Sequence, residues 1–522
     1  MNVAHPIAAL DLSIVAVYFV VVLVIGFWVA ARTRTGDDLF LAGRQLSWWA
    51  IGFSLFASNI SSTTLIGLAG AAYDSGIAVA NYEWMATVVL VFFAVFFIPV
   101  YIRTGISTVP EFLEHRFDVR SRNYFSGLTI VTNLVVDTAG SLFAGAMVLH
   151  TFFPGMNIYV TCSVLALVAG LYTAAGGLAA VVYTDVIQAL VLLVGSTVMA
   201  WLLFGKVDHS WAAVRQATPP GMLSMIRPLN DPSLPWLGTV IGVPVLGFYF
   251  WCTNQYIVQR VLGARGVDHA RWGALLGGLL KLPVLFIMVL PGTMARMVYP
   301  GLTRGDQVFP TLITRLLPTG AEGLVLAGLI AAIMSSIDST LNSASTLITL
   351  DFIKPRRPDM TPQQTARVGR IAIVGFMIFA ALWAPQIAHF EGLFNYLQAV
   401  LSYIVPPVAA LFVLGLFWSG VTPDAGFYTM LGGHALSIVI FVGQRIGLLP
   451  DIHFTIVAGL LFGVSCGLLV LLSLLTAPRD SAVAGSPPRL LSGAMGTGGI
   501  TDYRLLSAVL LLLTAALVIA FW

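Results

Sequence analysis

Apolar stretches of about 20 residues recur along the whole chain and are separated by short polar segments. A helix needs about 20 predominantly apolar residues to cross the hydrocarbon core of a bilayer. No segment between these stretches has the length or pattern of a soluble catalytic domain. The sequence therefore predicts an all-α membrane protein with one domain over residues 1–522 and 14 transmembrane helices, at 12–31, 46–72, 78–102, 123–152, 156–177, 181–204, 237–262, 270–299, 322–350, 365–385, 390–418, 421–443, 453–477 and 503–521.

Composition agrees with this pattern. Hydrophobic residues make up 58% of the chain and charged residues only 9%, whereas soluble proteins carry about 25% charged residues. The net charge of +3 is too small to indicate nucleic-acid binding, and no obligate protein partner is evident. The three cysteines lie within apolar segments, without the spacing of a metal site or a disulfide framework. Residues 12–31 are predicted to be a retained helix and not a signal peptide.

Lys and Arg are concentrated in alternate loops. If the N-terminus lies outside, most of the 26 basic residues fall in inner segments, clustered at 32–44, 103–122, 260–271, 354–370 and 479–504. Inner loops of membrane proteins carry an excess of Lys and Arg. We therefore expect both termini on the outer, periplasmic side of a bacterial inner membrane, with 205–236 as an outer loop and 478–500 as an inner linker.

Two predicted spans contain polar runs at mid-membrane depth, namely 57–64 (ASNISSTT) and 247–255 (GFYFWCTNQ). Polar backbone at that depth persists only where it is buried in protein or lines a cavity. A matched pair of interrupted helices indicates an inverted-repeat transporter. They would begin two five-helix repeats, 46–204 and 237–418, with 12–31 leading and 421–521 supplying three trailing helices.

Ionisable residues inside the spans are the candidates for chemistry, because each costs about 2.5–3.5 kcal/mol at a helix centre. They are Glu83, Asp137, Asp185, Lys281 and Asp338. Four acids and one base favour a site that accepts cations. The alternatives are that each acid is a structural partner of a nearby hydroxyl or N–H, and that Glu83 and Lys281 form a salt bridge between helices.

The ninth span combines hydroxyls at Ser335, Ser336 and Ser339 with the carboxylate of Asp338. These oxygens cover about one helical turn, and a break near Ala57 and Ile60 would free carbonyl oxygens. Such an oxygen set suits a hard cation such as Na+. The alternative is that the serines allow close helix packing.

Several blocks resemble the sodium/solute symporter family, and within it the sodium/glucose cotransporter branch. They run in family order over 54–66 (SLFASNISSTTLI), 97–117 (FIPVYIRTGISTVPEFLEHRF), 176–188 (GGLAAVVYTDVIQ), 251–261 (WCTNQYIVQRV), 335–351 (SSIDSTLNSASTLITLD) and 394–418. The resemblance covers about 41–418. It implies a LeuT-type fold with two inverted five-helix repeats and sodium-driven uptake by alternating access.

The resemblance also implies site residues. The sodium site shared across the family would use backbone oxygens of Ala57, Ile60 and Ala332 and the hydroxyls of Ser335 and Ser336. A second sodium, bound by some members, would use Asp185, Ser335, Asp338 and Ser339. The family usually has a hydroxyl or alanine where Asp338 stands, so this carboxylate would strengthen the second site or make it sensitive to protons.

For the substrate, the resemblance implies that Glu83, Lys281 and Gln398 hold sugar hydroxyls, that Tyr82 and Trp251 form pocket walls, and that Phe250 is the gate, in place of a tyrosine. Thr64 stands where relatives have a larger sugar-contacting side chain. Asp137 stands where they have an amide or amine, Ala86 replaces a hydroxyl, and Gly247 replaces an amide.

We therefore predict a sodium-coupled symporter, not an enzyme, that imports a hexose such as glucose or galactose. myo-Inositol is the nearest alternative, and an amino acid or monocarboxylate is a more distant one. A membrane-embedded enzyme or sensor is disfavoured, because no metal-ligand or nucleophile–base pair has usable spacing in the spans. Asp137 and Glu83 together disfavour an anionic substrate.

Overall fold

The computed structural model describes residues 7–152, 155–389, 393–476 and 499–522. Within these ranges the chain is helical, and the single β-bridge joins Leu46 to Ala264. The helices of the first half are α1 Ala9–Ala30, α2 Gly36–Leu41, α3 Trp48–Asn59, α4 Ser62–Ser75, α5 Asn81–Phe92, α6 Ile98–Thr104, α7 Val109–Arg116, α8 Val119–Thr132, α9 Ala139–Phe152, α10 Ile158–Gly205 and α11 Trp211–Ala217. Those of the second half are α12 Trp236–Ile241, α13 Val243–Phe248, α14 Gln255–Leu262, α15 Val267–Lys281, α16 Leu290–Val298, α17 Val308–Leu316, α18 Ala321–Leu347, α19 Lys354–Arg356, α20 Pro362–Trp383, α21 Leu393–Phe417, α22 Pro423–Arg445, α23 Phe454–Leu475 and α24 Tyr503–Ala520.

The described residues contain 12 helices long and apolar enough to cross a membrane, or up to 13 if the bent pair α3 and α4 forms one span. The expected number was 14. The difference has two sources: the bent pair α3 and α4 is not among the 12, and the expected spans 156–177 and 181–204 are counted together in the 48-residue helix α10. A straight helix of that length would extend about 72 Å, more than twice the hydrocarbon thickness of about 30 Å. Its backbone is non-helical at Gly177 (φ 59°, ψ −151°).

Both expected interruptions are present, and a polar side chain restarts each helix. α3 ends at Asn59, Ile60 leaves helical geometry, and the Ser61 hydroxyl accepts the Thr64 N–H at the start of α4. The two halves are bent by 57°. In the second interruption a π-helical turn, Tyr249–Thr253, follows α13, and extended Asn254 caps α14. A capping side chain replaces the missing backbone acceptor of a helix N-terminus, so both breaks are built into the sequence.

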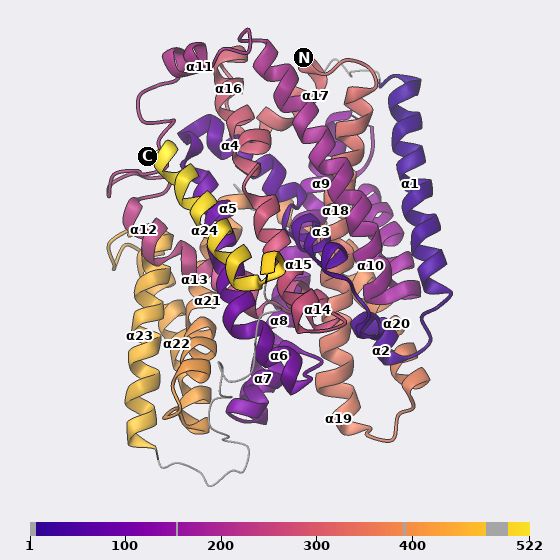
Figure 1. Cartoon of the computed structure of the whole chain (residues 1–522), viewed down its shortest axis with the longest axis vertical. Coiled ribbons are helices and arrows are strands. Elements are labelled where there is room, and N and C mark those ends of the chain that lie inside the picture. The colour runs from indigo at the N-terminus through magenta and orange to yellow at the C-terminus, as the bar shows by residue number, and fades with distance from the viewer. Residues whose placement is uncertain (1–6, 153–154, 390–392, 477–498) are drawn as a thin grey trace.

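Helix α18 lies at the centre of the bundle, and nearly every side chain along it is buried. It packs against α10, α1, α3 and α20. Figure 1 shows α1 at one edge of the bundle and α22 and α23 at the opposite edge. The first helix is tied to α18 by Asp11, whose Oδ1 accepts the backbone N–H groups of Gly320 and Gly323, both at 2.7 Å.

Several segments that connect the spans contain short helices and are not irregular loops throughout. The expected outer loop 205–236 contains the short helix α11. Three further short helices, α2, α7 and α17, lie between spans and were not expected. The expected linker 478–500 lies almost entirely outside the described residues.

Candidate functional site

A cavity of about 170 Å³ lies where the two interrupted helices approach each other. Its wall includes Asn59, Ser61 and Thr64 from the first interruption and Tyr249, Phe250 and Trp251 from the second. Since a single water needs only about 10–15 Å³ by the same kind of measure, the space can hold a small solute. Backbone irregularity at membrane depth therefore coincides with a cavity, as the hydrocarbon environment requires.

One wall carries a buried ion pair. Lys281 Nζ, from the end of α15, lies 2.5 Å from Glu83 Oε2 on α5. The same ammonium donates to Asn59 Oδ1, at the end of α3. It also lies 5.5 Å from the centre of the Trp251 ring, within cation–π range. The expected pair Glu83 and Lys281 is therefore in direct contact, and Trp251 lies beside it.

The other expected substrate residues are mostly gathered around the same space. Thr64, Tyr82, Asp137 and Phe250 all line the cavity. The Phe250 ring packs edge-on against Trp251, with ring centres 5.0 Å apart. Gln398 lies on α21, but its side chain falls outside the described residues.

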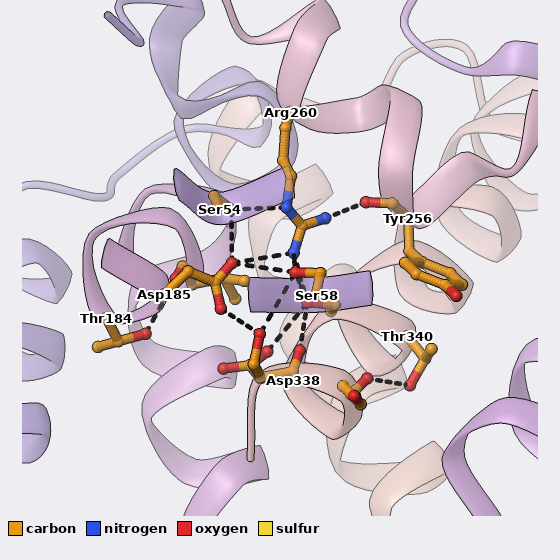
Figure 2. A network of polar contacts seen from close by, with 12 residues as sticks. Ser54, Ser58, Thr184, Asp185, Tyr256, Arg260, Asp338 and Thr340 are labelled. Carbon is orange, nitrogen blue, oxygen red and sulfur yellow. Dashed lines mark hydrogen bonds and ion pairs between the residues drawn. The ribbon is translucent and has the colours of Figure 1, made fainter. Parts of the chain in front are cut away.

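A second polar cluster surrounds Asp185 of α10 (Figure 2). We call it the deeper cluster, and its members besides Asp185 are Ser54, Ser58, Tyr172, Arg260, Ser335, Asp338 and Ser339. Asp185 Oδ2 accepts from Ser54 at 2.5 Å and from Ser58 at 3.2 Å. Its Oδ1 accepts from Ser335 at 2.5 Å. The guanidinium of Arg260 completes the group, with Nη2 at 3.1 Å from Asp185 Oδ2. Both charged side chains are buried, with at most 1% of either exposed.

Asp338 belongs to this cluster. Its Oδ1 accepts the Ser339 hydroxyl at 3.1 Å, and its Oδ2 accepts the hydroxyl of Tyr172. Ser339 in turn accepts from Arg260 Nη2 at 2.5 Å. The four residues expected at a second sodium site, Asp185, Ser335, Asp338 and Ser339, are therefore linked by hydrogen bonds.

The residues expected at the shared sodium site lie on α3 and α18, which pack together. Ala57, Ile60 and Ala332 are buried. Ser335 faces Asp185. Ser336 lines the cavity and donates to the Ala332 carbonyl at 3.0 Å. The two adjacent serines thus face the two different polar regions.

Sequence reasoning missed four members of the deeper cluster, namely Ser54, Ser58, Arg260 and Tyr172. Arg260 was counted among the inner-loop cations, whereas every residue of α14 is buried. The signal for a buried polar helix was a short, otherwise apolar run that contains Gln255, Gln259 and Arg260. Tyr172 carried no signal, because a tyrosine in an apolar span is most often packing. Charge counting also misplaced Arg271, which is 2% exposed and stacks on Tyr503.

Two solved structures share this architecture. A Na+-coupled sialic acid symporter in a substrate-bound outward-open state superposes with a TM-score of 0.79 at 24% identity, covering 90% of this chain and 99% of that one. A nucleobase-cation-symport-1 family transporter, in a closed conformation, gives 0.59 at 16% identity, covering 88% and 99%. These similarities show that the chain has an all-helical membrane fold of the LeuT type.

The profile of the Sodium:solute symporter family matches residues 39–433. Curated relatives include sodium/glucose cotransporter 4 of Homo sapiens, 35% identical over 90% of this chain and 76% of its own length. The sodium/myo-inositol cotransporter of Mus musculus is also 35% identical (90% and 74%), and sodium/glucose cotransporter 1 of Oryctolagus cuniculus is 33% identical (90% and 79%). The chain belongs to the Sodium:solute symporter family. It is a multi-pass membrane protein that couples solute transport to sodium and is not an enzyme, which confirms the expected family and class.

Proposed function

We propose that the protein imports a hexose or a closely related polyol together with sodium, by alternating access. The observation that carries this proposal is the Glu83–Lys281 pair at the cavity between the two interrupted helices. A polyol needs donors and acceptors at fixed angles, and a dry site penalises any polar group left unpaired. Glu83 Oε1 would accept hydroxyls, Lys281 holds Glu83 in its ionised form, and Gln398 would supply both donors and acceptors.

Sodium coupling in this proposal runs through α3 and α18. Sodium held by carbonyl oxygens of Ala57, Ile60 and Ala332 and by the hydroxyls of Ser335 and Ser336 ties the interruption after α3 to the central helix. That favours an outward-open cavity in which the solute binds. Closure of the outer side and displacement of Phe250 then release both inward. Each sodium that crosses 100 mV supplies about 2.3 kcal/mol in addition to its concentration gradient.

A second sodium at Asp185, Ser335, Asp338 and Ser339 is the further part of the proposal. The deeper cluster holds two carboxylates and one guanidinium. With both acids ionised its net charge is negative, and one more cation would neutralise it. The support is the hydrogen-bonded contact between the two acids through Ser335, Ser339 and Arg260. Two sodium ions would square the accumulation that one ion can drive.

The proposed topology has 14 spans. It counts the two parts of α10 on either side of Gly177 separately and the bent pair α3 and α4 once. Repeats 46–204 and 237–418 would be inverted relative to each other, and both termini would be periplasmic in a bacterial inner membrane. The excess of basic residues in alternate segments supports this orientation.

Uptake into proteoliposomes tests the function. Radiolabelled hexoses and myo-inositol are supplied with an inward sodium gradient, or with choline in its place. We expect accumulation of at least one polyol only with sodium, and loss of that accumulation in Glu83→Gln. myo-Inositol is a genuine second candidate, because glucose and inositol cotransporters are equally similar to this chain. Sodium-dependent uptake confined to amino acids or monocarboxylates would overturn the polyol assignment.

A further inference from the structure

The cavity wall carries more negative than positive charge. Two carboxylates, Glu83 and Asp137, line it, and the described lining residues include no Lys, Arg or His. Lys281 stands behind Glu83, with its ammonium committed to Glu83 and Asn59. Lys281 therefore neutralises Glu83, and the other cation near the wall, Arg260, is paired with Asp185.

Asp137 is left without a partner. It sits on the π-helical turn Asn133–Thr138 between α8 and α9. In the described part of the chain it makes no salt bridge, and no hydrogen bond to its carboxylate is found. The ionisable groups that interact with it electrostatically are the tyrosines Tyr249 and Tyr256, not a cation.

The Tyr249 hydroxyl provides a second, independent observation. The side chain is 3% exposed and lines the same cavity. Among the described residues no partner meets the geometry of a hydrogen bond to this hydroxyl, although the hydroxyls of Thr129 and Thr132 lie close to it. A buried hydroxyl without a partner costs free energy, and so does a buried carboxylate without a counter-charge. Both costs are relieved by one ligand group that is positively charged and rich in N–H donors.

We infer that Asp137 and Tyr249 form a subsite for a protonated amine, so that the preferred solute is an amino-substituted polyol, such as an amino sugar, and not a neutral one. This inference rests on the proposed function, because the rest of the solute is held as a polyol by Glu83 and its neighbours. An ammonium group carries three donors and no acceptor. It would donate to both Asp137 oxygens and to the Tyr249 oxygen, while the hydroxyls of the solute reach Glu83 Oε1. A neutral polyol leaves the charge of Asp137 unopposed.

Sodium-driven uptake of three matched sugars tests the inference. Glucose, 2-amino-2-deoxyglucose and its N-acetyl derivative are compared in proteoliposomes at pH 6.5, where the free amine is protonated. The N-acetyl compound keeps a substituent at the same carbon but removes the charge. Charged hydrogen bonds are worth about 1.5–3 kcal/mol, so we expect the amine to have a KM about 10- to 100-fold below that of glucose. The N-acetyl sugar should lose this advantage.

Asp137→Asn is the decisive variant, because it keeps the shape and removes the charge. We expect it to abolish the preference for the amine, measured as the ratio of the KM values for glucose and the amine in the same variant, and Tyr249→Phe to reduce that ratio by a smaller factor. Equal KM values for the amine and glucose in the wild type, or a preference unchanged in Asp137→Asn, would overturn the inference and leave the proposed function standing. Absence of sodium-dependent uptake of every polyol, with or without an amine, would instead overturn the proposed function and the inference with it.

Discussion

The protein contains two buried polar regions that have the same number of acidic and basic side chains but different contacts between them. Each has two carboxylates and one cation: Glu83, Asp137 and Lys281 around the cavity, and Asp185, Asp338 and Arg260 in the deeper cluster. In the deeper cluster every carboxylate oxygen accepts at least one hydrogen bond. Around the cavity one carboxylate is paired and the other is not.

This difference distinguishes a structural role of buried charges from a role in binding a solute. A fully bonded cluster holds helices in register and leaves space only for something as small as an ion. A partly bonded wall leaves capacity for the groups of a solute. Ser58 belongs to both regions, because its hydroxyl bonds Asp185 and its side chain lines the cavity. Tyr256 also links them, because it lines the cavity and its carbonyl accepts from Arg260. The two regions are thus adjacent.

The largest expected effect comes from removing the cation of the bonded cluster. Arg260→Ala leaves Asp185 and Asp338 close together without a counter-charge, and breaking such a buried pair costs about 3–5 kcal/mol. We expect a strongly lowered free energy of unfolding in detergent and no sodium-driven uptake. Arg271→Ala is the matched control, because that buried arginine bonds the Ala94 carbonyl and the Tyr503 ring, and no salt bridge to it is found within the described ranges. Equal losses for the two variants would show that burial matters and the carboxylates do not.

The second largest expected effect comes from replacing one aspartate in each region by the uncharged asparagine. Asp185→Asn weakens bonds from three serines and an arginine, and we expect it to lose about 2–3 kcal/mol of stability. Asp137→Asn removes a carboxylate that has no partner, so its stability should change by less than about 0.5 kcal/mol or rise. Thermal unfolding of the purified proteins, followed in parallel, measures both. A similar loss in Asp137→Asn would mean that Asp137 has a structural role.

The smallest expected effect comes from two tyrosines. Tyr172→Phe removes the donor to Asp338 Oδ2 and should cost about 1–2 kcal/mol, because it strands a buried carboxylate oxygen. Tyr249→Phe removes a hydroxyl that has no partner within the described residues. It should be neutral or slightly stabilising. The same thermal assay detects the difference, and a destabilised Tyr249→Phe would argue against a free hydroxyl at the cavity.

The spans and their two interruptions were predictable because each depends on a local pattern. An apolar run of about 20 residues identifies a span, and Ser61 or Asn254 after a polar run identifies the restart of a helix. The boundaries of α1 and α24 lie within a few residues of the expected ones. The break within α10 also falls where it was expected, because Gly177, whose backbone is non-helical, lies at the end of the expected span 156–177.

The partners of the buried charges were less predictable, because they depend on packing between distant helices. The salt bridge between Glu83 and Lys281 was one of the expected alternatives, because two opposite charges at membrane depth have few other groups that could neutralise them. Arg260 was misassigned because it is close in sequence to Arg265 and Arg271, which made it resemble a loop cation. Only the burial of α14 reveals that its guanidinium turns back toward Asp185, a residue 75 positions away in the chain.

The bond between Asp11 and the start of α18 has a consequence for how the protein is made. The first helix leaves the ribosome early, yet the two glycine N–H groups that its buried carboxylate binds are encoded 309 and 312 residues later. Asp11 stands in the first turn of α1, at the end of the span and not at its centre. The contact that ties the first span to the central helix therefore forms only after more than half of the chain has been made.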